Sequence, residues 1–279
     1  MDSKTLISLV NSCTKSRAYF RAVRWRGRRY CPWCNHSRKI YRLSDGKYRC
    51  SKCRKLFTEF SGTYLSGIKI PANIVLYLLH LFIMGVPVYR ISRVDKISRY
   101  GIARLFKRFR EAVYEKAENE LKDLVLSGEL ELDETMFGGH RKGKRGWGAV
   151  GKHIVFGMYQ RNGKVIFFPI PRRKAEHILP LVHRHTKKGS IYYTDDFRGY
   201  VSLVVRGEHV SIRKEKGIPV GENNINGMEG CWSYAKTWLY QYRGVHRDNF
   251  PLYLKEIEFR FNNRDKDLFD MLVNMLVRR

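Results

Sequence analysis

The chain has 279 residues, and its 54 Lys or Arg against 26 Asp or Glu give a formal net charge of +28. Hydrophobic residues make up 43% of the chain, which excludes a disordered protein and predicts a folded core. A charge this large opposes compaction unless a polyanion binds. Nucleic acid is therefore the expected partner, ahead of an anionic membrane surface.

The chain begins with MDSKTLISLVNSC, which has no basic leader, long apolar core or cleavage site, so secretion is not expected. Four cysteines follow as CPWC and CSKC with the spacing C-x2-C-x15-C-x2-C, which is typical of a zinc ribbon with four thiolate ligands. Two disulfides are the disfavoured alternative, because no secretory signal indicates an oxidising compartment. The predicted zinc ligands are Cys31, Cys34, Cys50 and Cys53.

Residues 38–49, between the two cysteine pairs, can form a short hairpin with Asp45-Gly46 as its turn. The remaining cysteines, Cys13 and Cys231, have no partner at metal spacing and are expected to be small buried hydrophobic residues. Basic and aromatic residues interleave over the first 60 residues, which favours contact with nucleic acid over a merely solvated surface. The expected DNA contacts here are Arg24, Arg26, Arg28, Arg29, Arg38 and Lys39.

Residues 68–118 are predicted to be helical. The apolar stretch at 70–88 contains Pro71, His80 and Pro87, and it predicts a buried core helix rather than a membrane span. A short helix should follow around Ile91, and Ser98 is a suitable N-cap for another. Basic residues beside the apolar stripe of this second helix favour a DNA-binding helix-turn-helix over a solvated helical hairpin. They are Arg99, Arg104, Lys107 and Arg108.

A linker helix is predicted from about Glu111 to Leu126, ended by Ser127-Gly128. From Glu129 the hydrophobic period changes to two, which predicts strands at 129–137, 152–160 and 164–171. The second and third should form a hairpin through Arg161-Asn162-Gly163. A helix at 175–186, strands at 190–196 and 210–214 and helices from 227 and 250 complete the chain. This running order is that of the ribonuclease-H-like α/β fold.

Asp133 is expected to end the first of these strands, and Asp195 and Asp196 the strand YYTDD. Those strand ends are neighbours in the ribonuclease-H-like fold, where crowded carboxylates repel unless cations join them. Two Mg²⁺ or Mn²⁺ ions about 3.5–4 Å apart would resolve the repulsion and support phosphoryl transfer. By strand alternation, Asp196 should point to the opposite face.

The helix after the last strand should supply a third metal ligand, and its position favours Glu229. Alternatively, Asn226 and Glu229 form a capping box at the helix start. Lys236 lies two turns beyond Glu229 on the same face, where it could reach a phosphate or be solvated. The glycine-rich loop after the first strand offers further expected DNA contacts at Arg141, Lys142, Lys144 and Arg145. No phosphate-binding GxxxxGK[ST] motif occurs, so ATP is not expected.

The stretches LDETMFGGHRKGKRGWG, YYTDDFRGY, NNINGMEGCWSYAKTWL and FPLYLKEIEFRFNNR resemble the catalytic core of ISXO-like insertion-sequence transposases, bacterial relatives of the Merlin transposons. The upstream zinc ribbon and helix-turn-helix match the family's order. The resemblance implies a DDE-type enzyme that nicks transposon ends and joins the exposed 3′ hydroxyls to target DNA. Asp133 and Asp195 match the two family aspartates.

Several family members carry Asn at the third position, followed by Lys, so Asn226 and Lys236 are catalytic candidates beside Glu229. The resemblance implies double-stranded DNA as partner, a homodimer or larger assembly, and a prokaryotic, cytoplasmic, nucleoid-associated location. The expected domains are a zinc ribbon at 1–66, a helix-turn-helix with linker at 67–127 and the catalytic domain at 128–279. The alternatives are a catalytically silent DNA-binding regulator and a structure-specific nuclease on the same fold.

Overall fold

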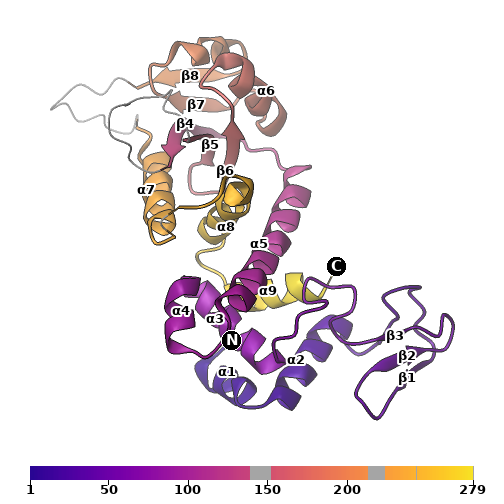
Figure 1. Ribbon diagram of the computed structural model, residues 1–279. Helices are drawn as coiled ribbons and strands as arrows, with labels where there is room; N and C mark the ends of the chain where they lie inside the picture. The colour runs from indigo at the N-terminus through magenta and orange to yellow at the C-terminus, as the bar shows by residue number, and fades with distance from the viewer. Residues whose placement is uncertain (139–151, 213–223, 243, 279) are drawn as a thin grey trace. The chain divides into compact units, whose positions relative to one another are not determined.

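The computed structural model describes residues 1–138, 152–212, 224–242 and 244–278 (Figure 1). It contains two compact units. One comprises Met1–Lys116 with Asp265–Arg279, and the other Ala117–Arg264. This division differs from the expected boundaries at 66/67 and 127/128. The zinc-ribbon and helical segments belong to one unit, and the last helix joins it because its apolar face, including Leu272 and Val273, packs beside the N-terminal helices.

The zinc-ribbon part of the first unit is a three-stranded antiparallel sheet. Strands β1 (Ile40–Arg42) and β2 (Tyr48–Cys50) form the expected hairpin, and β3 (Leu56–Phe57) pairs with β2. Gly46 takes a φ of +79° in the turn, a conformation that glycine adopts without steric cost. Trp25, Tyr48 and Phe57 form a small core beneath the sheet.

The helices of the first unit are α1 (Ser3–Val10), α2 (Cys13–Trp25), α3 (Ala72–Ile83), α4 (Val88–Val94), α9 (Leu268–Val277) and most of α5 (Arg99–Leu121). The apolar stretch at 70–88 forms the buried α3, as predicted. Among the described helices, none is both long and apolar enough to cross a membrane. The predicted second helix and linker helix are one continuous α5. Cys13 begins α2 and is exposed, so its predicted burial was wrong, whereas Cys231 is buried.

The second unit is built on a mixed five-stranded sheet with the order β6-β5-β4-β7-β8 (Figure 1). Its strands are β4 (Glu129–Phe137), β5 (His153–Gln160), β6 (Val165–Ile170), β7 (Ile191–Thr194) and β8 (Glu208–Ser211). The first three are antiparallel neighbours, and β7 and β8 run parallel to β4. The predicted β5–β6 hairpin is confirmed, with Asn162 at a φ of +57° in the turn.

Helices cover both faces of this sheet. Helix α6 (Ala175–His185) and the 3₁₀ segment η1 (Arg198–Val205) pack on the face that carries Leu130 and Leu132 of β4. Helices α7 (Asn226–Tyr240) and α8 (Phe250–Asn262), with the short η2 (Arg247–Asn249) before α8, cover the opposite face. Because strand residues alternate, Glu131, Asp133 and Phe137 share this second face.

Gly157 determines how closely α7 approaches the sheet. It pairs with Asp133 across the β4–β5 ladder. A Cβ atom added at Gly157 would lie 2.4 Å from Met228 and 2.6 Å from Trp232, both on α7. Only glycine therefore allows α7 to rest on the sheet at the level of Asp133.

Candidate metal centre and acidic site

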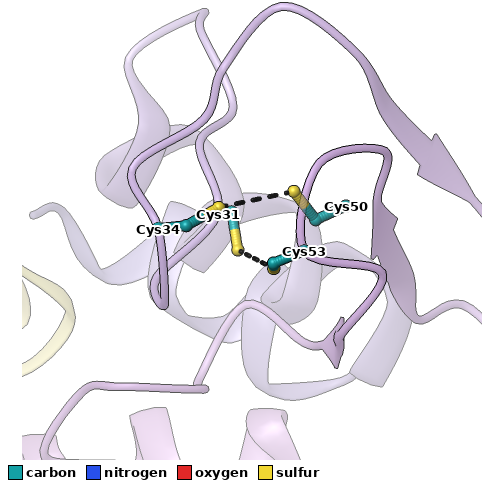
Figure 2. Close-up of side chains that lie close together, drawn as sticks. All are labelled: Cys31, Cys34, Cys50 and Cys53. Atoms are coloured by element: carbon teal, nitrogen blue, oxygen red, sulfur yellow. Dashed lines mark hydrogen bonds between the residues drawn. The ribbon is translucent and has the colours of Figure 1, made fainter.

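The four predicted zinc ligands meet in the first unit (Figure 2). Their sulfur atoms all lie within 4.8 Å of one another, with Cys31 Sγ 3.5 Å from Cys53 Sγ and Cys34 Sγ 3.6 Å from Cys50 Sγ. Sulfurs placed tetrahedrally at Zn–S bonds of about 2.3 Å would be roughly 3.8 Å apart. The donor set and its spacing therefore fit one structural zinc ion.

Most of the basic residues expected to contact DNA are exposed where the structure describes them: Arg26, Arg28, Arg29, Arg38, Lys39, Arg99, Arg104 and Lys107. Arg108 is half-buried and pairs with Glu111 at 3.5 Å. Arg141, Lys142, Lys144 and Arg145 lie outside the described residues.

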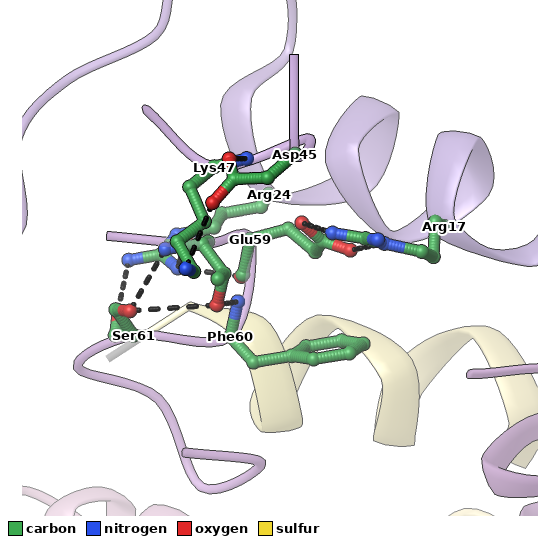
Figure 3. Close-up of polar contacts among 8 residues, drawn as sticks. Arg17, Arg24, Asp45, Lys47, Glu59, Phe60 and Ser61 are labelled. Atoms are coloured by element: carbon green, nitrogen blue, oxygen red, sulfur yellow. Dashed lines mark hydrogen bonds and ion pairs between the residues drawn. The ribbon is translucent and has the colours of Figure 1, made fainter. Parts of the chain in front are cut away.

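Arg24 requires a correction. Only 5% of it is exposed, and its guanidinium donates hydrogen bonds to the carbonyls of Glu59 at 2.5 Å and Ser61 at 2.7 Å (Figure 3). The buried Glu59 carboxylate in turn pairs with Arg17. Arg24 therefore fastens helix α2 to the segment after the ribbon, and it is not kept among the proposed DNA contacts.

The predicted strand bounds 129–137 are confirmed, but the prediction that Asp133 ends this strand was wrong, because Asp133 lies in the middle of β4. The strand continues to Phe137 because residues beyond Asp133 still pair with the antiparallel β5. Pairing with the parallel β7, however, stops at Glu131 and Tyr193. Extending that register by two residues sets Asp133 beside Asp195, which directly follows β7. Asp196 is exposed.

The two aspartates are close enough to affect each other. Burial raises the pKa of Asp133, and the negative charge of Asp195 raises it further. The indole Nε1 of Trp232 donates to Asp133 Oδ2 at 3.0 Å. Asp195 is more open, with 36% of its side chain exposed, and its Oδ1 accepts from the backbone N–H of Phe197 at 3.1 Å.

Arg173 links Asp195 to the interior of the sheet. Its Nη2 lies 2.6 Å from Asp195 Oδ2, and its Nε lies 3.1 Å from Glu134 Oε2. The hydroxyl of the buried Tyr200 donates to Glu134 Oε1 at 2.8 Å. Burial raises the pKa of Glu134 to about 7 despite these contacts. Glu134 faces away from Asp133 by strand alternation, so it supports the site from behind.

Glu131 holds the start of α7. It is 2% exposed, its Oε2 accepts from the Met228 backbone N–H at 2.7 Å, and its Oε1 accepts from Arg161 Nε at 3.0 Å. Arg161 also bonds the more exposed Glu129 at 2.9 Å and the carbonyl of Asn224 at 2.6 Å. A negative charge at a helix N-terminus is favourable, because the unpaired N–H groups and the helix dipole point toward it.

The capping-box alternative for Asn226 and Glu229 is wrong. The N-cap of α7 is Ile225, so Asn226 is already the first helical residue. The Asn226 backbone N–H instead bonds Asn224 Oδ1 at 3.1 Å, and Glu131 reaches the helix start from the sheet. Asn226 is exposed and Glu229 is half-buried in the first turn.

The three predicted metal ligands Asp133, Asp195 and Glu229 do not form one tight cluster. Among the described residues, the four cysteines meet the criterion of three or more candidate ligand atoms that all lie within 4.8 Å of one another. Asp133, Asp195 and Glu229 do not meet it. Lys236 is exposed and lines a neighbouring cavity. Glu229, Asn226 and Lys236 therefore stay predictions.

The sequence patterns did not identify the supporting residues, which are Arg173, Arg161, Glu131 and Trp232. Glu131 is visible in the acidic run ELELDE, and Arg173 in the basic run after β6. Neither run indicates its partner, because each contact joins residues that are distant in the chain.

Comparison with known proteins identifies two matching domains. The model of the ISXO2-like transposase domain matches residues 125–262, and that of the transposase zinc-ribbon domain matches residues 14–56. A transposase-like protein of Haemophilus influenzae is 37% identical over 103 residues, which cover 37% of this chain and 84% of that protein. A protein in the transposable element ISH50 of Halobacterium salinarum is 23% identical over 273 residues, which cover 85% of this chain and 87% of that protein.

Proposed function

Since the chain belongs to the family of ISXO2-like transposases, we propose that it cleaves DNA at the ends of its own element and joins the 3′-hydroxyl ends to target DNA. The observation that carries this proposal is the approach of Asp133 and Asp195 from β4 and the end of β7. The sheet order, with three antiparallel strands followed by two parallel ones, supports a ribonuclease-H-like fold for this unit.

The aspartate pair fits a divalent cation because two crowded carboxylates, one with a raised pKa, are relieved by a positive charge between them. Asp133 and Asp195 would hold two Mg²⁺ or Mn²⁺ ions, with Glu229 as the proposed third ligand and Asn226 as its fallback. Ions held there would supply Lewis-acid activation of the attacking oxygen and charge stabilisation of the leaving 3′ oxygen.

The protein's own residues would prepare this site. Trp232 fixes the rotamer of Asp133 through its 3.0 Å hydrogen bond, and Arg173 restrains Asp195 from the other side. Glu131 and Arg161 set the position of α7, which carries Glu229. Each aspartate thus has a partner that limits its motion before DNA arrives, which is how a catalytic constellation is held in position.

DNA binding is assigned to the first unit. The zinc ribbon, with its exposed Arg and Lys residues, and the α4–α5 pair, proposed as a helix-turn-helix, would hold double-stranded element ends. Basic side chains position a protein on phosphates, so affinity should fall steeply with salt. A homodimer or larger assembly is proposed, because two ends must be joined to one target.

The proposal is tested with DNA that carries the sequences flanking the gene, incubated with the zinc-loaded protein and Mg²⁺ or Mn²⁺. Wild type should cut at the element ends, Asp133→Asn and Asp195→Asn should not, and Asp196→Asn should cut normally as the matched control. If wild type and Asp133→Asn show the same background cutting while binding the DNA, the silent-regulator alternative holds. Cutting of branched DNA without joining of a pre-cleaved end would indicate the nuclease.

A further inference from the structure

A cavity of about 630 Å³ lies in the second unit, beyond the acidic site along β4. Its volume is within the roughly 300–1,000 Å³ that small-molecule sites occupy. The sheet, α7 and the segment leading into α8 all contribute to it. Its described lining residues include Phe137, His153, Lys236, Tyr240, Arg247 and Phe250.

The floor of the cavity is apolar and aromatic. Phe137 and Phe250 are 5% and 3% exposed, with ring centroids 5.8 Å apart. The His153 ring stacks on Phe250, with centroids 4.1 Å apart and planes inclined by 7°. Burial, and after it the charge of Arg247, lower the pKa of His153, which favours the neutral imidazole in this wall.

The rim of the cavity is cationic. Lys236 and Arg247 are exposed, and so is Tyr240, at 77%. None of the described lining residues is acidic. These features fit a ligand that is aromatic at one end and anionic at the other. The apolar floor and the exposed aromatic side chain suit a flat ring, and the two cations suit negative charge.

Trp232 connects this cavity to the acidic site. Its Nε1 bonds Asp133, and its ring centroid lies 6.0 Å from that of Phe137 at an interplanar angle of 71°. Asp133 and Phe137 face the same side of β4, four residues or about 13 Å apart. That span is roughly four nucleotides at the 3.4 Å rise of stacked DNA, and fewer in an unstacked strand.

We propose that the cavity holds one unpaired nucleotide of the DNA strand that crosses the acidic site. Its base lies between the apolar floor and Tyr240, and its phosphates lie beside Lys236 and Arg247. A paired and stacked base could not place its face on the floor, so the nucleotide must leave the helix. The inference rests on the proposed function, and it assigns Lys236 to phosphate binding.

The test uses the full-length, zinc-loaded protein without Mg²⁺. The probes are a 5′-phosphorylated thymidine tetranucleotide and an abasic tetranucleotide with the same phosphates. Tyr240→Ala should weaken binding of the thymidine probe about tenfold and leave the abasic probe unchanged, since stacking involves the base. Lys236→Gln with Arg247→Gln should weaken both probes. Lys164→Gln, an exposed charge at the far end of the β5–β6 hairpin, should weaken neither.

A photoreactive 5-iodo-deoxyuridine in the thymidine probe locates the base directly. Cross-links should map to Tyr240 or to the floor residues Phe137, His153 and Phe250, and they should disappear when Lys236 and Arg247 are both changed to Gln. Cross-links elsewhere, unaffected by these changes, overturn the proposal. The two proposals can fail separately. If the protein cleaves DNA with metal but makes no base contact in the cavity, only the nucleotide-binding proposal is rejected. If the cavity binds the base but the protein does not cleave DNA, only the transposase proposal is rejected.

Discussion

Trp232 donates its indole N–H to the carboxylate of Asp133 at 3.0 Å, which joins helix α7 to the middle of strand β4. The contact is possible because Gly157, opposite Asp133, has no side chain to hold α7 away. The same ring stacks on Phe167, with centroids 4.8 Å apart. One tryptophan thus serves both the core and the acidic site, where it restrains a proposed metal ligand.

Trp232→Phe should remove the hydrogen bond and keep most of the ring packing. The protein should remain folded, and Mn²⁺ should bind about tenfold more weakly, because partners that orient a metal ligand contribute that much. Calorimetric Mn²⁺ titration measures the effect. Trp238→Phe is the matched control, since the buried Nε1 of Trp238 has no hydrogen-bond partner among the described residues. Equal losses in both variants would show that Trp232 acts only through packing.

Glu131→Gln should destabilise the protein by roughly 3 kcal/mol, because it leaves the partly buried Arg161 without its buried counter-charge and removes the charge at the start of α7. Glu129→Gln changes the more exposed ion pair of Arg161, and it should lower the free energy of unfolding by less than about 1 kcal/mol. Urea unfolding of the two variants gives both values. Similar losses would contradict a special role for Glu131.

The Arg173–Glu134 contact should appear as coupling in a double-mutant cycle. Arg173→Met alone leaves Glu134 buried without its charge partner, and the added Glu134→Gln change removes that penalty. The free energies of unfolding should therefore be non-additive by about 1–3 kcal/mol. The Tyr200 hydroxyl can still bond the amide in the double variant. Additive effects would mean that Arg173 does not neutralise Glu134.

Removing zinc should weaken DNA binding without changing Mn²⁺ binding, because the ribbon depends on its metal and the acidic site lies in the other compact unit. Cys50→Ser should have the same effect as chelation, and Cys13→Ser, which changes an exposed cysteine outside the cluster, should have none. Zinc release and DNA affinity are measured on the same samples. Unchanged DNA affinity after complete zinc loss would exclude this role for the ribbon.

Local patterns predicted the local features of this protein. Cysteine spacing located the zinc cluster, and the Asp45-Gly46 and Asn162-Gly163 pairs located two hairpin turns, because each depends on a few adjacent residues. Cys13 was predicted to be buried and is exposed, and Arg24 was predicted to contact DNA and is buried. Both outcomes depend on which helix packs against which segment.

The acidic site was predictable only in part, for the same reason. Strand alternation and the running order of the fold predicted that Asp133 and Asp195 lie close together. The strand at 129–137 was predicted from its alternation, but the prediction that Asp133 ends it was wrong, because β4 continues to pair with β5 beyond that residue. The roles of Arg173, Glu131 and Trp232 arise from contacts between residues 22 to 99 positions apart.

The most direct test of the paired aspartates is Mn²⁺ binding to the full-length, zinc-loaded protein, followed by electron paramagnetic resonance without DNA. Asp133→Asn and Asp195→Asn should each lower Mn²⁺ affinity by at least about tenfold, since changes even outside the ligand shell have effects of that size. Asp196→Asn should leave the Mn²⁺ affinity unchanged. The Mn²⁺ affinity of Glu229→Gln tests whether Glu229 is the third ligand. Unchanged Mn²⁺ affinity in both the Asp133 and Asp195 variants would contradict a shared metal site.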